Sequence, residues 1–219
     1  MNPKAISFIT CVNNDEWYQE CLLYIHRLEV PDGYTVDTIA VRDAVSMAGG
    51  LNQGMRGSDA KYKVYLHQDV FIVNRHFIKD ILTIFANPAI GLIGVVGSRS
   101  IPPNGIWWEA QTIFGQVYDS HRGRLEKLSF QAIDQEYAET DCVDGLLMAT
   151  QYDLPWREDL FTGWHCYDLS QCGEFRRRNY KVAVPRQEEA WCIHDCGVTR
   201  MDNDYHHYRE IFVKEYLGH

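Results

Sequence analysis

Three polar residues, His67, Gln68 and Asp69, directly follow a segment with the pattern of a β-strand. Residues 62–66 alternate between an apolar and a polar face, the period of two expected for a strand. Open α/β sheets bind their ligands where such strands end. Asp69 offers a hard oxygen ligand to Mg²⁺ or Mn²⁺, and His67 could add a borderline nitrogen, a pair that suits Mn²⁺ better than Ca²⁺. The pattern predicts a metal site for binding phosphates, and a second interpretation, in which Asp69 caps the following helix, stays open.

The composition limits the classes of protein to consider. A chain of 219 residues with 46% hydrophobic content is long enough for one sizeable core, so we expect a single domain. A formal net charge of -9 argues against a nucleic-acid surface, which needs an excess of Lys and Arg. We also expect no secretory signal and no transmembrane segment. Seven scattered cysteines, an odd number, favour a reducing compartment, and we therefore expect the cytoplasm.

One group of possible zinc ligands occurs near the end of the chain. Cys192, His194 and Cys196 lie close together in the sequence, and Cys166 and Cys172 precede them. Structural zinc sites usually show paired Cys-x-x-Cys or His-x-x-x-His spacings, and neither spacing occurs here. We therefore do not expect zinc.

The first half of the chain alternates between strand and helix patterns. Such alternation predicts a mostly parallel sheet with right-handed crossovers and helices on both faces. The expected strands are residues 6–12, 36–41, 62–67 and 90–96, and the expected helices are residues 16–28 and 76–85. Between them, residues 45–57 form a glycine-rich, partly helical connection, for which close packing and a frayed loop are both open interpretations.

The second half of the chain has a different character. A proline-containing loop at residues 98–104 precedes a segment that predicts an antiparallel hairpin on the sheet edge. The expected elements are hairpin strands at 111–118 and 125–132, strands at 143–150 and 180–185, and helices at 167–178 and 204–217. The last helix carries aromatic residues at near-helical spacing, so it docks on its own domain or on a partner, and we favour its own domain.

The order of these motifs, down to Gly197, resembles the GT-A glycosyltransferases, and within them the glycosyltransferase family 2 type. The resemblance implies an α/β, Rossmann-like GT-A fold: a mostly parallel central sheet flanked by helices, with a small antiparallel hairpin insertion and a C-terminal helix. It also implies one domain, with a nucleotide-binding half at 1–97, an acceptor-binding half at 98–197 and a helical tail at 198–219.

The resemblance assigns roles to residues of the first half. The metal-binding Asp-x-Asp motif of the family corresponds to His67-Gln68-Asp69, in which the first Asp is missing. Asp69 is then the single carboxylate for the metal, with His67 beside it, and His194 resembles a late metal-binding His of some members. The nucleotide contacts implied by the resemblance are Thr10, Cys11, Asn13, Asp43, Asn52 and Gln68.

The resemblance also assigns roles to residues of the second half. Asp168 falls where the family has its catalytic base, although the Glu that usually precedes it is Tyr167 here. As a base at the start of a helix, Asp168 would have its charged form stabilised by the helix dipole, which lowers its pKa. The alternative role for Asp168 is the N-cap of that helix. The acceptor-binding candidates are Trp108, Asp144, Gly145, Trp164 and His165. The tryptophans, together with Trp107, either stack on a sugar ring or belong to the core.

The resemblance therefore implies an inverting glycosyltransferase. Its donor would be a nucleotide-diphosphate sugar, with a UDP-sugar favoured, and its acceptor a hydroxyl of a saccharide or another molecule. Mn²⁺ or Mg²⁺ would neutralise the departing diphosphate. A catalytically silent GT-A module that binds nucleotide or carbohydrate is the main alternative. A nucleotidyltransferase is disfavoured, because residues 11–15 lack the Gly-rich basic loop it would need.

Overall fold

The structure, a computed structural model, describes residues 1–198 and 202–218. Its centre is a seven-stranded sheet in which β11 and β9 run antiparallel to their neighbours and the other five strands share one direction. The mostly parallel sheet expected from the sequence is thereby confirmed. The strand order is β2 (Thr35–Arg42), β1 (Asn2–Val12), β3 (Ala60–Leu66), β11 (Leu147–Thr150), β5 (Ile90–Gly94), β12 (Lys181–Pro185) and β9 (Tyr137–Thr140).

A second, smaller sheet packs beside the first. Its strand order is β10 (Cys142–Val143), β6 (Val96–Ser98), β7 (Ile113–Asp119), β13 (Cys192–His194) and β4 (Val70–Ile72), and β8 (Glu126–Ser129) pairs with β7. The predicted hairpin exists as the antiparallel pair of β7 and β8. Its place was predicted wrongly, because it belongs to the smaller sheet and not to an edge of the larger one.

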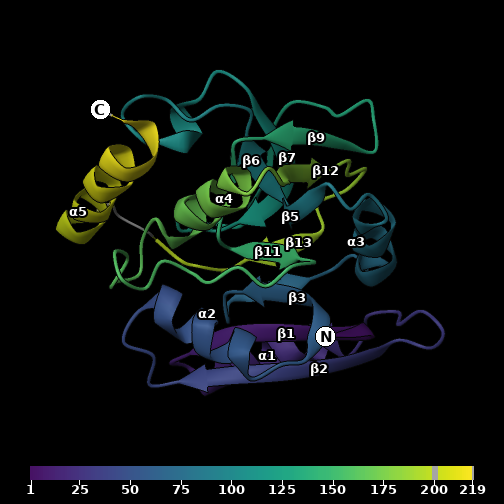
Figure 1. Cartoon of the computed structure of the whole chain (residues 1–219). Helices are drawn as coiled ribbons and strands as arrows, with labels where there is room; N and C mark the ends of the chain where they lie inside the picture. The colour runs from purple at the N-terminus through teal and green to yellow at the C-terminus, as the bar shows by residue number, and fades with distance from the viewer. Residues whose placement is uncertain (199–201, 219) are drawn as a thin grey trace.

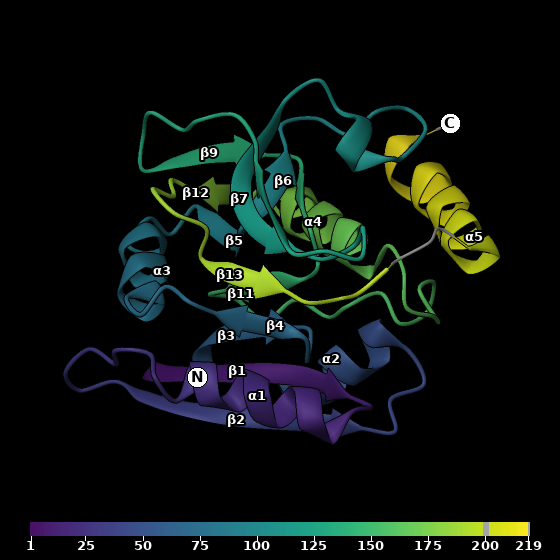
Figure 2. The same cartoon turned by 180° about the vertical axis from the view of Figure 1, so that it is seen from behind.

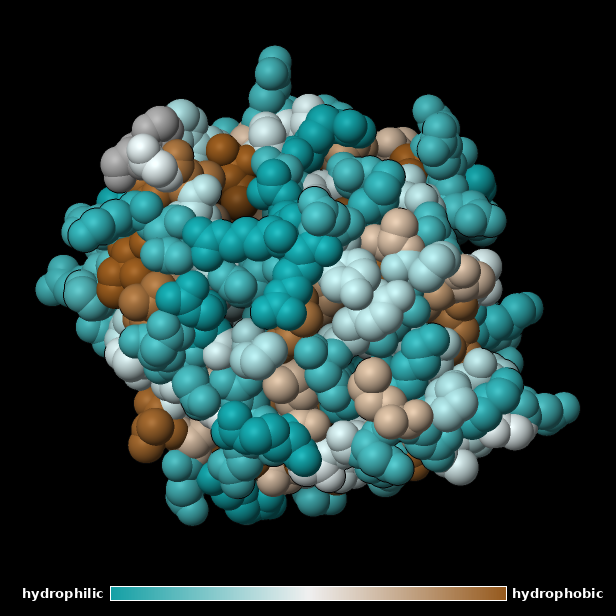
Figure 3. All heavy atoms as spheres, viewed as in Figure 1, coloured by the Kyte–Doolittle hydropathy of each residue, from teal (hydrophilic) through white to brown (hydrophobic). Residues whose placement is uncertain are grey.

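Helices cover both faces of the larger sheet. α2 (Met47–Arg56) and α4 (Tyr167–Arg177) lie on the face seen in Figure 1. α1 (Asp15–Ile25) and the smaller sheet lie on the opposite face, seen in Figure 2, and α3 (Phe77–Phe85) lies at one side. The face with α2 and α4 is mostly hydrophilic, with small separate hydrophobic areas (Figure 3). Among the described residues, no helix has the length and apolar character needed to cross a membrane.

Two local features explain how the first helices form. Asn14 caps α1, because its side-chain oxygen accepts hydrogen bonds from the backbone N–H groups of Glu16 and Trp17, as expected for a residue at this position. In α2, a Cβ atom on Gly54 would overlap with the side chain of Ile9. The glycines of α2 therefore allow the helix to approach β1 closely, and the frayed-loop interpretation of this segment is wrong.

The C-terminal helix docks on its own domain, as favoured from the sequence. α5 (Asn203–Phe212), followed by a π-helical turn (Val213–Leu217), buries Tyr205, Tyr208 and Phe212 against the rest of the chain. The Tyr208 ring lies 6.4 Å from the Phe161 ring, and its hydroxyl is 3.0 Å from that of Thr162. The contact places α5 beside the loop that leads into α4.

Candidate functional site

Strand register in the smaller sheet places three candidate residues in a row. In the antiparallel pair of β4 and β13, His194 lies opposite Val70, the residue after Asp69. In the parallel pair of β13 and β7, His194 lies opposite Asp119. The order across the sheet is therefore Asp69, His194 and Asp119, although these residues are far apart in the sequence.

Asp69 faces two imidazole rings. Its Oδ1 atom is 3.8 Å from Nε2 of His194 and 4.0 Å from Nδ1 of His67. The atom is buried and finds no hydrogen-bond partner in the part of the chain that the structure describes. Two ligands that each bind an ion at about 2 Å lie roughly 3 to 4 Å from each other, so the three side chains fit one divalent ion. The alternative that Asp69 caps a helix is wrong, because the N-cap of α3 is His76.

Two further residues orient the imidazoles. Nδ1 of His194 is 2.9 Å from Oδ2 of Asp119, and Nε2 of His67 is 2.5 Å from the hydroxyl of Tyr167. These bonds occupy one nitrogen of each ring and direct the other nitrogen toward Asp69. The sequence did not reveal either residue. Asp119 directly follows the strand predicted at 111–118 and Tyr167 begins a predicted helix, but no local pattern connects them with residues 67–69.

The pKa values of the two histidines in this cluster are shifted in opposite directions. Burial, followed by the nearby His194, lowers the pKa of His67. Burial also opposes protonation of His194, but hydrogen bonds with Asp119 and Cys196 and the charge of Asp69 together raise its pKa well above the ordinary value. Although burial acts in the opposite direction, hydrogen bonds from His194 and His121 lower the pKa of Asp119 to about 2. Asp119 is therefore an anion at neutral pH.

Asp168 lies in the first turn of α4 and directly follows Tyr167, whose hydroxyl contacts His67. Its Oδ2 atom accepts a 3.0 Å hydrogen bond from the backbone N–H of Gly145. Cys166 is the N-cap, so the capping interpretation of Asp168 is wrong. Burial, and then the charge of Asp144, raises the pKa of Asp168 to about 7. The lowered pKa expected from the helix dipole is therefore also wrong, because desolvation outweighs the nearby N–H groups.

The segment that includes Asp144 and Gly145 packs tightly against α4. The side chain of Asp144 accepts a hydrogen bond of 2.9 Å from the backbone N–H of Leu146. A Cβ atom on Gly145 would overlap with the hydroxyl of Tyr167, so only glycine fits here. Gly145 thus also holds Tyr167 and Asp168 in place.

Gln68 joins the ends of two parallel strands. Its Oε1 atom accepts hydrogen bonds from the backbone N–H groups of Asn13 and Asn14, at 3.0 and 2.9 Å, and its Nε2 atom donates to Oδ1 of Asn13. The ends of β1 and β3 are therefore held together beside Asp69. Contact of Gln68 or Asn13 with a nucleotide stays a prediction, but the Gln68 amide already has a structural role.

The other predicted nucleotide contacts differ in accessibility. Asn52 is 1% exposed, and both of its amide atoms bond to the backbone of Trp156 at 2.9 Å. Thr10 is also fully buried. Both side chains are covered by the protein's own atoms, and their contact with a nucleotide stays a prediction. Cys11 is partly exposed near the end of β1, and Asp43 is exposed just after β2, so both stay candidates.

The acceptor-side aromatic residues separate into two kinds. Trp107 is buried, which confirms the core interpretation for this residue. Trp108 and Trp164 are 41% and 44% exposed and are available to a ligand. The rings of Trp108 and His165 lie 5.5 and 5.8 Å from Tyr205 of α5. The start of α5 therefore contributes to this aromatic group, which the sequence did not predict.

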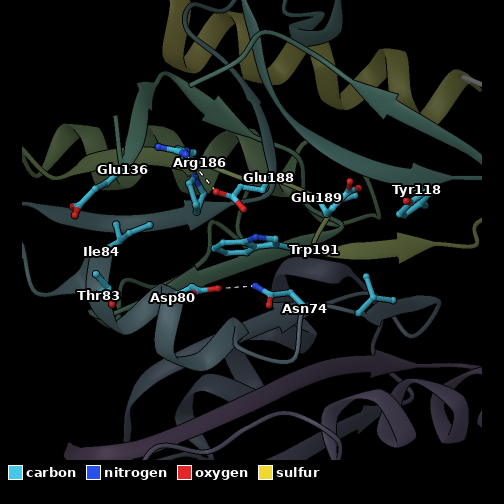
Figure 4. A pocket seen from close by; sticks show the side chains of 13 residues that line it. Asn74, Asp80, Thr83, Ile84, Tyr118, Glu136, Arg186, Glu188, Glu189 and Trp191 are labelled. Carbon is cyan, nitrogen blue, oxygen red and sulfur yellow. Dashed lines mark hydrogen bonds and ion pairs between the residues drawn. The ribbon is translucent and has the colours of Figure 1, made fainter. Parts of the chain in front are cut away.

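A cavity of about 820 Å³ lies between α3 and the end of β12, separate from the cluster (Figure 4). None of the predicted site residues lines it. Several of its polar side chains are already paired: Asn74 donates to Asp80 at 2.7 Å, and Arg186 to Glu188 at 3.3 Å. We therefore place the candidate functional site at the cluster and not in this cavity.

Residues 7–216 match a protein-family model described as "Glycosyltransferase like family". The chain belongs to this glycosyltransferase-like family. The match covers nearly the whole sequence, including all the residues of the cluster and Asp168. No curated protein sequence matches the chain.

Solved structures show that this family member has the GT-A fold. GalNAc-T7 with UDP, GalNAc and Mn²⁺ matches with a TM-score of 0.65 and 9% identity, over 99% of this chain and 49% of that one. A mannosyltransferase of Pyrobaculum calidifontis with GDP-Man and Mn²⁺ matches with a TM-score of 0.55 and 13% identity, over 99% of this chain and 62% of that one. S. aureus TarS 1–349 with UDP-GlcNAc matches with a TM-score of 0.52 and 11% identity, over 94% of this chain and 60% of that one. The chain thus spans about half to three fifths of these structures.

Proposed function

We propose that the protein is an inverting glycosyltransferase that uses a divalent metal and a nucleotide-diphosphate sugar. One observation carries the proposal: in a member of a glycosyltransferase-like family, a buried carboxylate oxygen of Asp69 without a hydrogen-bond partner faces the His67 and His194 imidazoles. The position follows β3, where the resemblance puts the metal-binding motif. A histidine in place of the first Asp of that motif is thus compatible with an ion.

The ligand set favours Mn²⁺ over Mg²⁺. Two imidazole nitrogens and one carboxylate oxygen suit a metal that accepts nitrogen ligands, whereas Mg²⁺ prefers oxygen and water. When bound, the ion supplies the positive charge that stabilises the diphosphate leaving group. His194 is kept in position for this task by its hydrogen bond with Asp119.

Asp168 is the proposed catalytic base. A carboxyl group with a pKa of about 7 is half ionised near neutral pH, and its carboxylate is basic enough to take the proton of an attacking hydroxyl. The Gly145 N–H holds one of its oxygens, which fixes the orientation of the group. A base that activates the acceptor directly implies a single displacement, and the anomeric carbon is therefore inverted.

We favour a UDP-sugar as donor and a hydroxyl of a saccharide or another molecule as acceptor. Two of the three structures described above contain UDP or UDP-GlcNAc and one contains GDP-Man, and these names support a nucleotide-sugar donor without fixing the base. In this proposal residues 1–97 bind the nucleotide and residues 98–197 bind the acceptor. The exposed rings of Trp108 and Trp164 would stack on the apolar face of a sugar.

A catalytically silent module is the second candidate. It is favoured by the observation that Thr10, Asn52 and Gln68, three of the predicted nucleotide contacts, are buried or already hydrogen bonded within the protein. In a silent module the cluster would still bind an ion, but Asp168 would have no catalytic task.

A donor-cleavage assay distinguishes these two candidates. UDP-sugars and GDP-mannose are incubated with Mn²⁺ and a panel of saccharide acceptors, and the release of nucleoside diphosphate is measured. We expect release with one donor, a loss of about 10² to 10⁴-fold in Asp168→Asn, and an inverted anomeric signal of the product by NMR. Nucleotide binding without any donor cleavage would support the silent module, and a retained anomeric configuration would contradict the proposed mechanism.

A further inference from the structure

A second group of possible metal ligands shares His194 with the cluster. Asp119, His194 and Cys196 each offer a ligand atom, and these atoms all lie within 4.8 Å of one another. Nδ1 of His121 is 2.5 Å from Oδ1 of Asp119, so a second imidazole borders the group. The set combines sulfur, nitrogen and oxygen, unlike the first cluster, which has no sulfur.

The backbone holds this second group in place. The N–H groups on both sides of Cys196 are hydrogen bonded: that of Asp195 to the carbonyl of Asp69, and that of Gly197 to the side chain of Ser120, both at 2.9 Å. The N–H of Ser120 in turn donates to the carbonyl of His194 at 3.2 Å. Cys196 is therefore fixed next to the ends of β7 and β13, where the other ligands are.

We propose that Asp119, His194 and Cys196 form a binding site for a thiophilic divalent cation of the Zn²⁺ class. Zn²⁺ binds sulfur, imidazole and carboxylate in a tetrahedron, with ligand atoms roughly 3.5 Å apart, which small side-chain movements would reach from the present positions. The fourth ligand is His121 or a water molecule. Binding requires the Cys196 thiol, and His194 if it is protonated, to release a proton to solvent, and no redox step is involved.

The two sites compete through His194. In the present structure, the 2.9 Å hydrogen bond between Asp119 and Nδ1 of His194 directs Nε2 of His194 toward Asp69. A soft ion bound by Asp119 would break this hydrogen bond. A bound Zn²⁺ would instead hold the His194 ring toward Asp119 and Cys196, so that the ring no longer keeps its position at the first cluster. Zn²⁺ would thus inhibit the transferase while Mn²⁺ activates it. This competition rests on the proposed function, whereas the existence of the sulfur-containing site does not.

Cobalt titration of the whole protein tests the site. Co²⁺ replaces Zn²⁺ and gives a thiolate-to-cobalt charge-transfer absorption only when a Cys sulfur is bound. We expect this absorption in the wild type, its loss in Cys196→Ser and its disappearance on addition of Zn²⁺. Cys11→Ser is the matched control, because Cys11 and Cys196 are the two partly exposed cysteines and the other five are buried. Cys11→Ser should keep the absorption.

Two results would overturn the site: no charge-transfer absorption at saturating Co²⁺, or an absorption that persists in Cys196→Ser. A measurement on the wild type covers the case in which Cys196→Ser does not fold. Zn²⁺ should protect Cys196 from alkylation, located by mass spectrometry, and Mn²⁺ should not; equal alkylation with and without Zn²⁺ contradicts the site. Because neither readout uses a nucleotide or a sugar, failure here and failure of the proposed transferase are distinguishable.

Discussion

His194 is the residue on which the candidate site depends most, because its two ring nitrogens face different carboxylates. Nε2 lies 3.8 Å from Asp69, and Nδ1 lies 2.9 Å from Asp119. The first distance suits a shared ion and the second a hydrogen bond. Asp119 thereby contributes to metal binding although we assign it no bond to that ion.

Replacing Asp119 by Asn tests this indirect role. The amide keeps the size of the side chain but loses the charge that favours a proton on Nδ1 of His194. We expect Mn²⁺ affinity, measured by calorimetry, to fall about 10 to 100-fold, as is common when the partner of a metal-bound histidine is changed. The thermal unfolding temperature checks that the variant is folded. An unchanged Mn²⁺ affinity in a folded variant would show that Asp119 does not orient His194.

The pKa of Asp168 predicts how activity depends on pH. A base works only when ionised, and a pKa raised from 3.8 to about 7 means that the carboxylate is present above pH 7 and lost as pH falls below it. The rate of donor cleavage at low substrate concentration should therefore fall about tenfold per pH unit on the acid side. Residual activity of Asp168→Asn should lack this dependence. An acid limb centred near pH 4 would instead indicate an unperturbed carboxylate.

At the scale of single residues, the sequence led to His67, Asp69 and His194, which the structure brings together, and to Asp168, which follows Tyr167, the hydrogen-bond partner of His67. It did not lead to Asp119, because the link between β7 and β13 is a register between strands 75 residues apart. The structural role of Asn52 was missed for a related reason. Its partner, the backbone of Trp156, is 104 residues away, and only the fold shows that its amide is already used.

Among the elements, α2 shows how glycines permit close packing on a strand. A methyl group on Gly54 would meet the buried Ile9 side chain of β1, so we expect Gly54→Ala to lower the free energy of unfolding by about 1 to 3 kcal/mol. Gly57→Ala at the end of the same helix is the control. There the backbone φ is -77°, and the added carbon would meet only ordinary contacts. Urea unfolding of both variants measures the difference, and equal stabilities would contradict the packing.

Long elements were easier to predict than short ones. The strands and helices of the first half have enough residues to show a period of two or 3.6, and they were found within a few residues of their bounds. β4 and β13 have only three residues each and were missed, although together they carry His194 to Asp69. The antiparallel direction of β11 within the larger sheet also depends on tertiary packing and not on any local pattern.

At the scale of the whole molecule, α5 packs on the body of the domain beside the loop that leads into α4. Phe212 is 1% exposed, and truncation to Ala should lower the free energy of unfolding by about 3 to 5 kcal/mol, measured by urea unfolding. Glu210→Ala on the exposed side of the same helix is the control and should change stability little. If Phe212→Ala unfolds like the control, α5 is not part of the core.

The most direct test of the proposed transferase is calorimetric titration with UDP and GDP, each with and without Mn²⁺, of the wild type and of Asp69→Ala. Asp134→Ala, at an exposed position, is the control for loss of a carboxylate. We predict that one nucleotide binds only with Mn²⁺, that Asp69→Ala abolishes this binding and that Asp134→Ala retains it. Absence of nucleotide binding with Mn²⁺, or equal binding by Asp69→Ala, would contradict the metal-dependent donor site.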